Sequence, residues 1–256
     1  MPSENVGSSA ATAPLDRRAR KREARRDHLL DLAADLVDAG GVDGLTMAAL
    51  AEAADYATAS LYTYFPSRSA LLAALQQRAL GVLASVGDAA RVRWDEALAQ
   101  AAPRPEVAAL ARLVAFSDLF LAAPVRHRRE FRLQQQLLVT PGAEEAADAG
   151  AVVPAAMAVL ELPRQLLDAA ASAGALRRED RLADPLGAPL DAALGRTFAW
   201  VLALNGALLA DGLVTGLPTT GALLGAQLTD ALLLGWGADP DDLGDARRLA
   251  SPWKEA

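Results

Sequence analysis

The stretch LTMAALAEAADYATASLYTYFPSR, residues 45–68, decides how this chain folds. Thr46 has the side chain of an N-cap and precedes a short apolar segment, 47–54, that suits a helix of about two turns. After a short break comes a second helical segment, 58–65, which Pro66 ends because proline cannot continue a helix. The stretch therefore predicts two short helices joined by a tight turn.

A longer helix precedes this pair. Apolar residues recur at helical spacing over 26–39, and Gly40 and Gly41 then end the segment. Two short helices that are joined by a turn and braced by a longer helix form a helix-turn-helix. Because the second helix of such a motif enters the major groove, the N-terminal part of the chain is predicted to bind DNA.

The same residues resemble the N-terminal signature of the TetR family of transcriptional regulators. The similarity covers roughly residues 25–75 and includes the Leu-Tyr-x-Tyr-Phe block and a serine followed by a basic residue. The matching positions are Leu45, Thr46, Met47, Leu50, Ala51, Ala54, Leu61, Tyr62, Tyr64, Phe65, Ser67, Arg68 and Leu71. The resemblance implies an all-α protein with an N-terminal three-helix DNA-binding domain, followed by a helical domain that dimerises and binds a small-molecule effector.

The resemblance also implies a function. It indicates a repressor that binds a near-palindromic operator in double-stranded DNA as a homodimer and is released by the effector. It implies phosphate contacts from Thr46, Tyr62 and Arg68, and Ser67 suits the cap of the helix that Arg68 opens. For Thr46 a role as helix cap alone is an equal alternative, and for Tyr62 the alternative is a half-buried surface aromatic.

Two positions depart from the family pattern. Asp55 stands where the family has the glycine of the turn, and Asp is one of the few residues that tolerates a left-handed backbone. Ala57 stands where a serine usually opens the recognition helix, and its side chain cannot cap a helix. We expect Thr58 to take over the cap and to shift the start of the helix by one residue.

The outward surface of the recognition helix is predicted to carry small hydroxyl and methyl groups and one phenol, while Leu61, Tyr64 and Phe65 turn inward. The predicted DNA-facing residues are Thr58, Ala59, Ser60, Tyr62 and Thr63. This set lacks the Arg, Asn and Gln side chains that bind bases in a bidentate manner. We therefore expect specificity to depend on half-site spacing and DNA shape.

A basic segment lies just upstream, at 17–26, with Glu23 as its only acidic residue, although the whole chain has a formal charge of −7. Its cations are Arg17, Arg18, Arg20, Lys21, Arg22, Arg25 and Arg26. Such asymmetry is typical of a chain of which one end meets phosphate. We expect an arm that reaches the minor groove, with Arg22, Arg25 and Arg26 as DNA contacts; a solvated charge run is the alternative.

Composition indicates the class of the whole chain and excludes several functions. Of the 256 residues 52% are apolar and only 5% aromatic, and Ala and Leu, which favour helices, dominate. The lack of cysteine excludes disulfide scaffolds, Cys-ligated zinc and thiol nucleophiles, and suits a cytoplasmic location. His28 and His127 lack the spacing of a metal motif, so we expect no cofactor, no metal site and no enzymatic activity.

The predicted regions are a disordered tail at 1–16, a basic arm and helix-turn-helix domain at 17–66, a helical effector-binding and dimerisation domain at 67–238, and a C-terminal tail at 239–256. A helix over 69–87 is expected to link the two domains. The apolar stretch 198–217 raises the question of a membrane span. Its Asn205, Asp211 and glycines favour a buried helix instead.

The last two strong helices, 190–214 and 219–234, are apolar on most of their surface. A helix that is apolar nearly all round is buried on more than one side. The second side is either another subunit, as the resemblance implies, or the interior of the same chain. A two-fold dimer would place its recognition helices about 34 Å apart, which is one turn of B-DNA.

A mixed stripe of aromatic and polar residues marks the candidate effector site. Phe116 and Phe120 are four residues apart, and His127, Phe131 and Gln134 follow on the next helix. Such a stripe suits either a packed core or an apolar pocket with a few polar groups, and the resemblance places the effector among these middle helices. The basic residues of the helix that carries Phe131 and Gln134 form a solvated face or, alternatively, a contact for an acidic effector.

Two other functions remain open from the sequence. An enzyme of helical fold would need a nucleophile, an acid-base pair or a metal cluster, and the sequence shows none. A ligand-independent activator or architectural protein would share the helix-turn-helix. Loss of DNA binding in the presence of a ligand would separate a repressor from these proteins.

Overall fold

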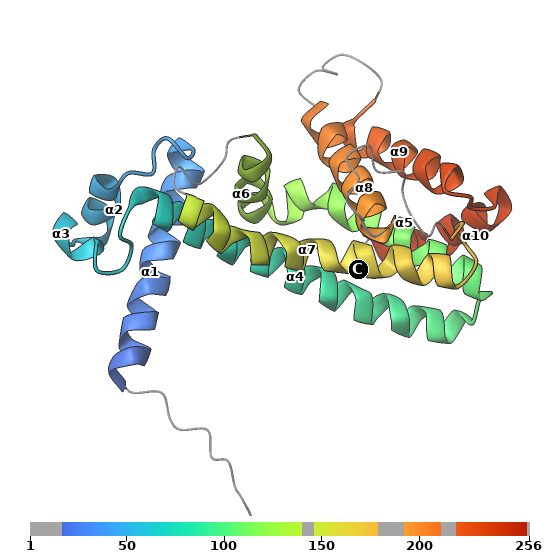
Figure 1. Cartoon of the computed structure of the whole chain (residues 1–256), viewed down its shortest axis with the longest axis horizontal. Helices are drawn as coiled ribbons and strands as arrows, with labels where there is room; N and C mark the ends of the chain where they lie inside the picture. Colours follow the sequence, from blue (N-terminus) through green and yellow to red (C-terminus); the bar gives the residue numbers. More distant parts are fainter. Residues whose placement is uncertain (1–16, 140–145, 179–191, 211–218, 255–256) are drawn as a thin grey trace, which may run out of the picture. The chain divides into compact units, whose positions relative to one another are not determined.

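The computed structural model describes residues 17–139, 146–178, 192–210 and 219–254. These parts of the chain are helical and contain no strand (Figure 1), which confirms the predicted all-α class. The chain divides into two compact units, Met1–Leu71 and Leu72–Ala256. The predicted domain boundary at residue 66 falls inside the first unit, because Leu71 is fully buried there.

The first unit contains the predicted helix-turn-helix. It consists of α1 (Arg17–Gly40), α2 (Met47–Ala54), α3 (Thr58–Leu61) and the first turn of α4 (Arg68–Ala101). Each helix contributes apolar side chains to one small core. The most deeply buried of them are Leu29, Leu30, Ala33, Ala34, Val37, Leu45, Leu50, Leu61, Phe65 and Leu71.

Helix α1 begins at Arg17 and not at 26, so the prediction of an arm was wrong: the basic segment 17–26 is part of a helix. Arg, Lys, Glu and Ala are all good helix formers, and the segment contains neither Gly nor Pro. Its side chains are exposed up to Arg25. No apolar periodicity therefore marked this part of the helix in the sequence.

Helix α3 is shorter than the predicted segment 58–65 and ends at Leu61. Beyond it the amides of Thr63 and Tyr64 donate to carbonyls three residues earlier, at 3.3 and 2.9 Å. The hydroxyl of Thr63 also donates to the Ser60 carbonyl at 2.7 Å. A side chain that binds its own backbone competes with helical pairing, and this explains the early end of the helix.

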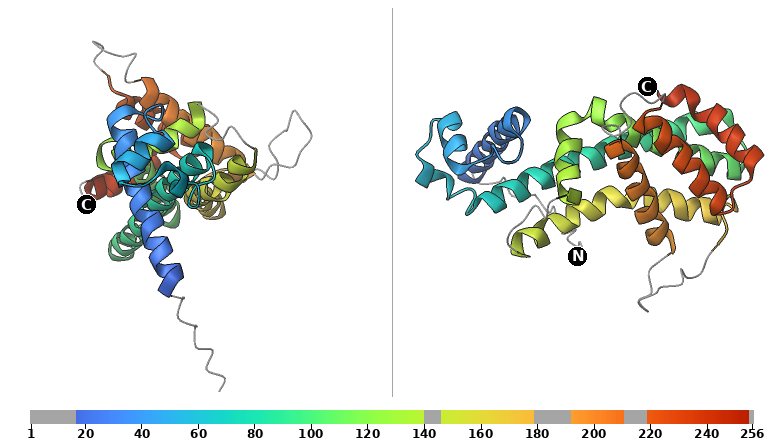
Figure 2. Two further views of the ribbon diagram at one scale, coloured as in Figure 1. Left: turned by 90° about the vertical axis from the view of Figure 1, so that its left-hand side faces the viewer. Right: turned by 90° about the horizontal axis from the view of Figure 1, so that it is seen from above.

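The second unit is built around α5 (Pro105–Arg126). The remaining elements are the rest of α4, α6 (Arg128–Val139), α7 (Ala146–Ser172), α8 (Ala192–Leu209), α9 (Gly221–Gly235), α10 (Pro240–Ala250) and a 3-10 turn (Ser251–Lys254). Helix α5 packs against α6 to α10, bonds to α4 through Arg112 and Asp95, and buries most of its apolar residues. Helices α8 to α10, in orange and red, gather in the same part of the unit (Figure 2).

Helix α4 continues to Ala101, so the prediction that it ends at 87 was wrong. Gly87 is not a stop signal but a point of close packing against α7. A Cβ added at Gly87 would lie only 2.9 Å from Cδ2 of Leu162. A glycine inside a helix can thus reflect a neighbouring helix instead of a boundary.

The C-terminal segment 239–256 was predicted as a tail, and this prediction was also wrong. The Asp239 side chain accepts from two amides of the first turn of α10, at 2.9 and 3.1 Å, and Pro240 opens the helix. Leu243, Ala246 and Ala250 are buried in the core around α5. Residues 239–254 are therefore an integral part of the second unit.

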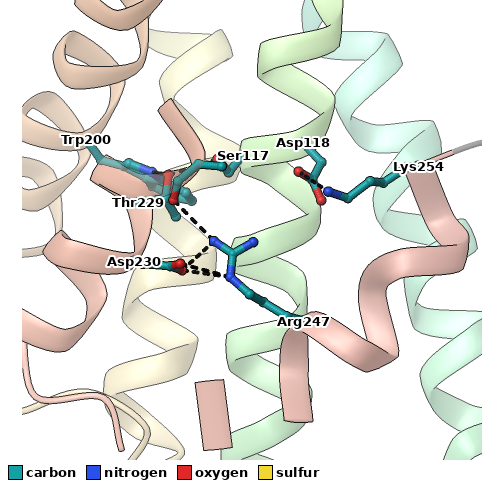
Figure 3. A network of polar contacts seen from close by, with 8 residues as sticks. Ser117, Asp118, Trp200, Thr229, Asp230, Arg247 and Lys254 are labelled. Atoms are coloured by element: carbon teal, nitrogen blue, oxygen red, sulfur yellow. Dashed lines mark hydrogen bonds and ion pairs between the residues drawn. The ribbon is translucent and has the colours of Figure 1, made fainter. Parts of the chain in front are cut away.

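A buried polar network joins α5, α8 and α9 (Figure 3). The Thr229 hydroxyl accepts from the Trp200 indole at 2.9 Å and lies 2.8 Å from the Ser117 hydroxyl. All three side chains are buried. Close by, Arg247 of α10 donates from Nε to the two carboxylate oxygens of Asp230, at 2.9 and 3.0 Å. These contacts fix the last helices in one register.

Helices α8 and α9 lie within the predicted segments 190–214 and 219–234, apart from the last residue of α9. Residues 179–191 and 211–218 lie outside the described parts, as does the predicted tail 1–16. By length and composition alone, three other helices, α4, α5 and α7, could cross a membrane.

Candidate functional site

Thr46 and Asp55 hold the two ends of α2. The Thr46 hydroxyl accepts a hydrogen bond from the Ala49 amide at 3.0 Å, which confirms its role as helix cap. Asp55 adopts a left-handed conformation, with φ 54° and ψ 46°, as predicted for the residue that replaces the turn glycine. The phosphate contact of Thr46 remains a prediction.

The start of the recognition helix differs from the prediction. Residue Ala57 occupies the N-cap position without a side-chain hydrogen bond, and Thr58 is already the first helical residue. The expectation that Thr58 caps the helix was therefore wrong. The Ala57 carbonyl accepts from the Ser60 amide at 2.8 Å, so the turn closes through the backbone alone.

The predicted DNA-facing residues share one exposed surface. They are Thr58, Ala59, Ser60, Tyr62 and Thr63. Tyr62 is 50% exposed, so its predicted DNA contact and the alternative of a half-buried surface aromatic both stay open. Leu61 and Phe65 are buried and Tyr64 is half-buried, so the inward set is confirmed.

Two arginines of the basic segment contact the predicted recognition segment, residues 58–65. Arg22 donates from Nη2 to the Thr63 carbonyl at 3.0 Å. The Arg26 guanidinium lies 5.5 Å from the centre of the Phe65 ring, within the range of a cation–π contact. Arg25 is exposed and bonds to no other described residue. The sequence missed this role, although Arg22 and Arg26 share one helix face.

Arg68 acts as a clamp on the loop between α1 and α2. It donates from Nε to the Leu45 carbonyl and from Nη2 to the Val42 carbonyl, both at 2.6 Å. Ser67 caps α4 as predicted, since its hydroxyl accepts from the Ala70 amide at 3.0 Å. Arg68 thus has a structural task within the unit, and its phosphate contact remains a prediction.

The second unit contains a cavity of about 370 Å³ that is lined by α4, α5, α6 and α7 and by His127, which lies between α5 and α6. All five residues of the predicted effector site line it: Phe116, Phe120, His127, Phe131 and Gln134. The rings of Phe120 and Phe131 meet edge to face, with their centres 5.7 Å apart. The structure therefore brings the predicted site together at one place.

Most of the cavity wall was not predicted from the sequence. Helix α4 contributes Asp88 and Arg91, and α7 contributes Glu161 and Gln165. The Arg164 guanidinium and then the Gln165 amide stabilise the Glu161 carboxylate and lower its pKa to about 2. No local pattern signals such residues, because they come together only through the packing of distant helices.

A sequence model described as "Bacterial regulatory proteins, tetR family" matches residues 29–75. The match covers the helix-turn-helix, from the core of α1 to the first turns of α4. Residues 29–75 therefore carry the N-terminal domain of the TetR family. Proteins of this family are DNA-binding transcriptional regulators, and the exposed surface of α3 remains the predicted nucleic-acid interface.

Solved structures of other proteins share the fold. A putative transcriptional regulator from Saccharomonospora viridis in complex with choline is 16% identical, with a TM-score of 0.56 over 83% of this chain and 96% of its own. SmeT, the repressor of the Stenotrophomonas maltophilia multidrug efflux pump SmeDEF, is 18% identical, with a TM-score of 0.56 over 86% and 94%.

RolR in complex with resorcinol is 22% identical, with a TM-score of 0.52 over 91% of this chain and 96% of its own. At these identities the likeness establishes the TetR-like fold and no shared ligand. Direct comparison with curated protein sequences finds no match.

Proposed function

We propose that this TetR-family protein is a ligand-responsive repressor, which binds a near-palindromic operator as a homodimer and is released by a small molecule. It acts in the cytoplasm and has no enzymatic activity. The observation that carries the proposal is the cavity of about 370 Å³, whose size is typical of small-molecule sites. Residues 83–91 of α4 line this cavity, and the same helix begins in the DNA-binding unit.

The proposed operator contacts come from both parts of the first unit. Thr58, Ser60 and Tyr62 would reach bases and phosphates from the recognition segment. Arg25 is the best placed of the predicted arginines for phosphate, because Arg22 and Arg26 already contact the recognition segment. Thr46 and Arg68 would add phosphate contacts alongside their structural roles.

An apolar surface on α8 and α9 supports the homodimer. Six large apolar side chains of these helices are at least 40% exposed: Phe198, Leu202, Leu209, Leu223, Leu228 and Leu234. An exposed apolar surface of this kind marks an interaction site, and a two-fold axis would bury it against its own copy. Such a dimer would present its recognition helices about 34 Å apart.

The dimer is tested by Leu202→Glu, because Leu202 is 55% exposed on α8. A charge at the centre of an apolar interface is costly. We expect sedimentation to show a dimer for the wild type and a monomer for the variant, with operator binding lost as well. Val92→Glu is the matched control, since Val92 of α4 is 52% exposed outside this surface. A dimeric Leu202→Glu protein would contradict the proposed interface.

The ligand response is tested with DNA from the region upstream of the protein's own gene. Fluorescence anisotropy of this duplex is measured at rising salt and in the presence of small molecules. A repressor of the proposed kind loses affinity as salt rises and as the effector binds the conformation that fits DNA less well. DNA affinity that no cavity ligand changes would favour a ligand-independent activator or architectural protein instead.

A further inference from the structure

One side of the cavity in the second unit, its floor, is formed by aromatic rings. Phe116, Phe120 and Phe131 are buried there, and the ring centres of the first two lie 6.2 Å apart. The aliphatic side chains of Leu119 and Leu162 continue the same surface. Since removal of apolar surface from water supplies most of the affinity in such sites, the floor favours an aromatic or compact hydrocarbon body.

The charged groups at the wall balance in sign: Asp88 and Glu161 are acidic, and Arg91 and the neighbouring Arg164 are basic. Both oxygens of Glu161 are bound by Arg164, at 2.9 and 2.7 Å, and Gln165 donates to one of them at 2.8 Å. Nη1 of Arg91 lies 4.0 Å from Oδ2 of Asp95, while its buried Nε has no hydrogen-bond partner in the described parts of the chain. A cationic ligand would compete with Arg164, an anionic one with Asp95, and either would lose its water on entry. Burial of a net charge is therefore unfavourable here.

The wall offers uncharged hydrogen-bonding groups instead. Proline has no amide hydrogen, so Pro124 and Pro163 leave the carbonyls of Phe120 and Val159 without their helical partners four residues later. Phe120 and Val159 both line the cavity. Where such a carbonyl borders the cavity, it can accept a hydrogen bond from a ligand.

Two polar side chains of the wall are likewise uncommitted. His127 and Gln134 line the cavity, and neither bonds to another side chain or backbone group in the described parts of the chain. An imidazole and an amide can each donate and accept. They lie on the side of the cavity formed by α6 and the end of α5, together with Phe131.

We infer that the effector is an uncharged aromatic compound that carries a hydroxyl group, with its ring on Phe116, Phe120 and Phe131 and its hydroxyl bound by the polar groups of α5 and α6. This inference rests on the effector-binding function proposed above. It selects one ligand class from those that a small apolar cavity could accept.

The test uses four probes with one hydrocarbon body and different head groups. These are para-butylphenol, para-butylanisole, para-butylbenzoate and para-butylphenyl trimethylammonium. Calorimetry with the full chain at pH 7 should show that the phenol binds about tenfold more tightly than the anisole, because only the phenol donates a hydrogen bond. The two ions should bind more than about tenfold more weakly than the phenol. Equal binding of the anisole, tighter binding of an ion, or no binding of the phenol would overturn the inference.

A pair of adjacent glutamines locates the binding site. Gln134 lines the cavity and Gln135 does not. Gln134→Leu should weaken the phenol about threefold to tenfold and leave the anisole unchanged, while Gln135→Leu should change neither. Phe120→Ala should weaken all binding, because it removes floor surface. Equal effects of the two glutamine substitutions would contradict binding in this cavity, even if Phe120→Ala failed to fold.

The calorimetry separates this inference from the proposed function. If the phenol binds as expected but DNA affinity does not change, the ligand class stands and the ligand-responsive repressor fails. If the phenol does not bind while another small molecule releases DNA, the repressor stands and the ligand class fails.

Discussion

The two units of this chain use their polar side chains in different ways. In the first unit, arginines reach backbone carbonyls: Arg68 holds Val42 and Leu45, and Arg22 holds Thr63. In the second unit, arginines such as Arg196 also reach backbone carbonyls, but helices pack over a large apolar core and buried polar side chains bind one another inside it. A small unit has little apolar surface to bury. Arginine side chains that bond to backbone carbonyls therefore stabilise loops that apolar packing alone would not hold in place.

This difference has a consequence for mutation. A residue of the first unit that shapes the recognition segment belongs to the predicted DNA-binding surface, so its substitution is expected to affect stability and DNA binding together. In the second unit the cavity is separate from the Ser117–Thr229–Trp200 network, except that Phe116 stacks on Trp200 with ring centres 5.1 Å apart. The polar residues of the cavity wall, such as Gln134, can therefore be changed without disturbing this network.

The largest effect should come from Arg68→Ala in the first unit. It removes two charge-assisted hydrogen bonds of 2.6 Å from a partly buried site, which should cost about 2–3 kcal/mol. Hydrogen exchange of the full chain should show faster exchange around residues 42–47 and little change in α5. Arg25→Ala, which removes an equal charge from an exposed position, is the control. If the exchange rates of the loop amides did not change, apolar packing alone would hold the loop, and the proposed difference between the two units would be wrong.

The corresponding substitution in the second unit is Thr229→Val. It leaves the Trp200 indole without its acceptor in a fully buried site, which should cost about 2 kcal/mol in urea unfolding. Thr229→Ser keeps the hydroxyl and should cost about 1 kcal/mol or less, through a lost methyl group. If both variants lost the same stability, the hydrogen bonds would not matter and packing would explain the site.

A smaller effect is expected for Arg22→Ala, because its bond to the Thr63 carbonyl is exposed. Loss of about 1 kcal/mol should weaken specific operator binding about fivefold. Binding to unrelated DNA should fall less, since only the recognition segment is disturbed. Arg25→Ala should instead weaken both kinds of DNA alike and reduce the salt dependence by about one unit. Identical behaviour of the two variants would mean that Arg22 is simply another phosphate contact.

The smallest effect concerns Glu161 on the cavity wall. Its pKa of about 2 in the folded state lies below the usual value of about 4.3. The pairing therefore stabilises the fold above pH ~4.3 and is lost as pH falls toward 2. Because the side chain is 46% exposed, Glu161→Gln should cost only about 0.3–0.5 kcal/mol at pH 7. In denaturant titrations, the difference in unfolding free energy between the variant and the wild type should shrink below pH ~4. A difference that stayed constant with pH would contradict the ion pair.

The helix-turn-helix was predictable because its signals are local. The Thr46 cap, the left-handed Asp55 and Pro66 follow one another within a short stretch, and each acts on its immediate neighbours. The extension of α1 had no such signal, because its side chains are exposed and charged. Helix propensity is the only property that could have indicated it.

In the second unit the sequence identified the α5 and α6 residues of the cavity but not those of α4 and α7. Phe116 and Phe120 form a visible stripe at helical spacing, whereas Asp88 and Glu161 become neighbours only when distant helices pack. Helix α10 did carry a signal, since Asp239 and Pro240 form a typical helix start. Only Leu243, Ala246 and Ala250 of this helix are buried, so the apolar pattern that follows this start is weak.

The most direct test of the account measures operator affinity of the full chain with and without para-butylphenol, for the wild type and for Ala123→Phe, which fills the cavity with a ring. The phenol should lower the operator affinity of the wild type at least about fivefold, which is the low end of typical allosteric coupling. For Ala123→Phe, the ratio of operator affinities without and with the phenol should be about one. Equal ratios for the two proteins would show that the cavity does not control DNA binding.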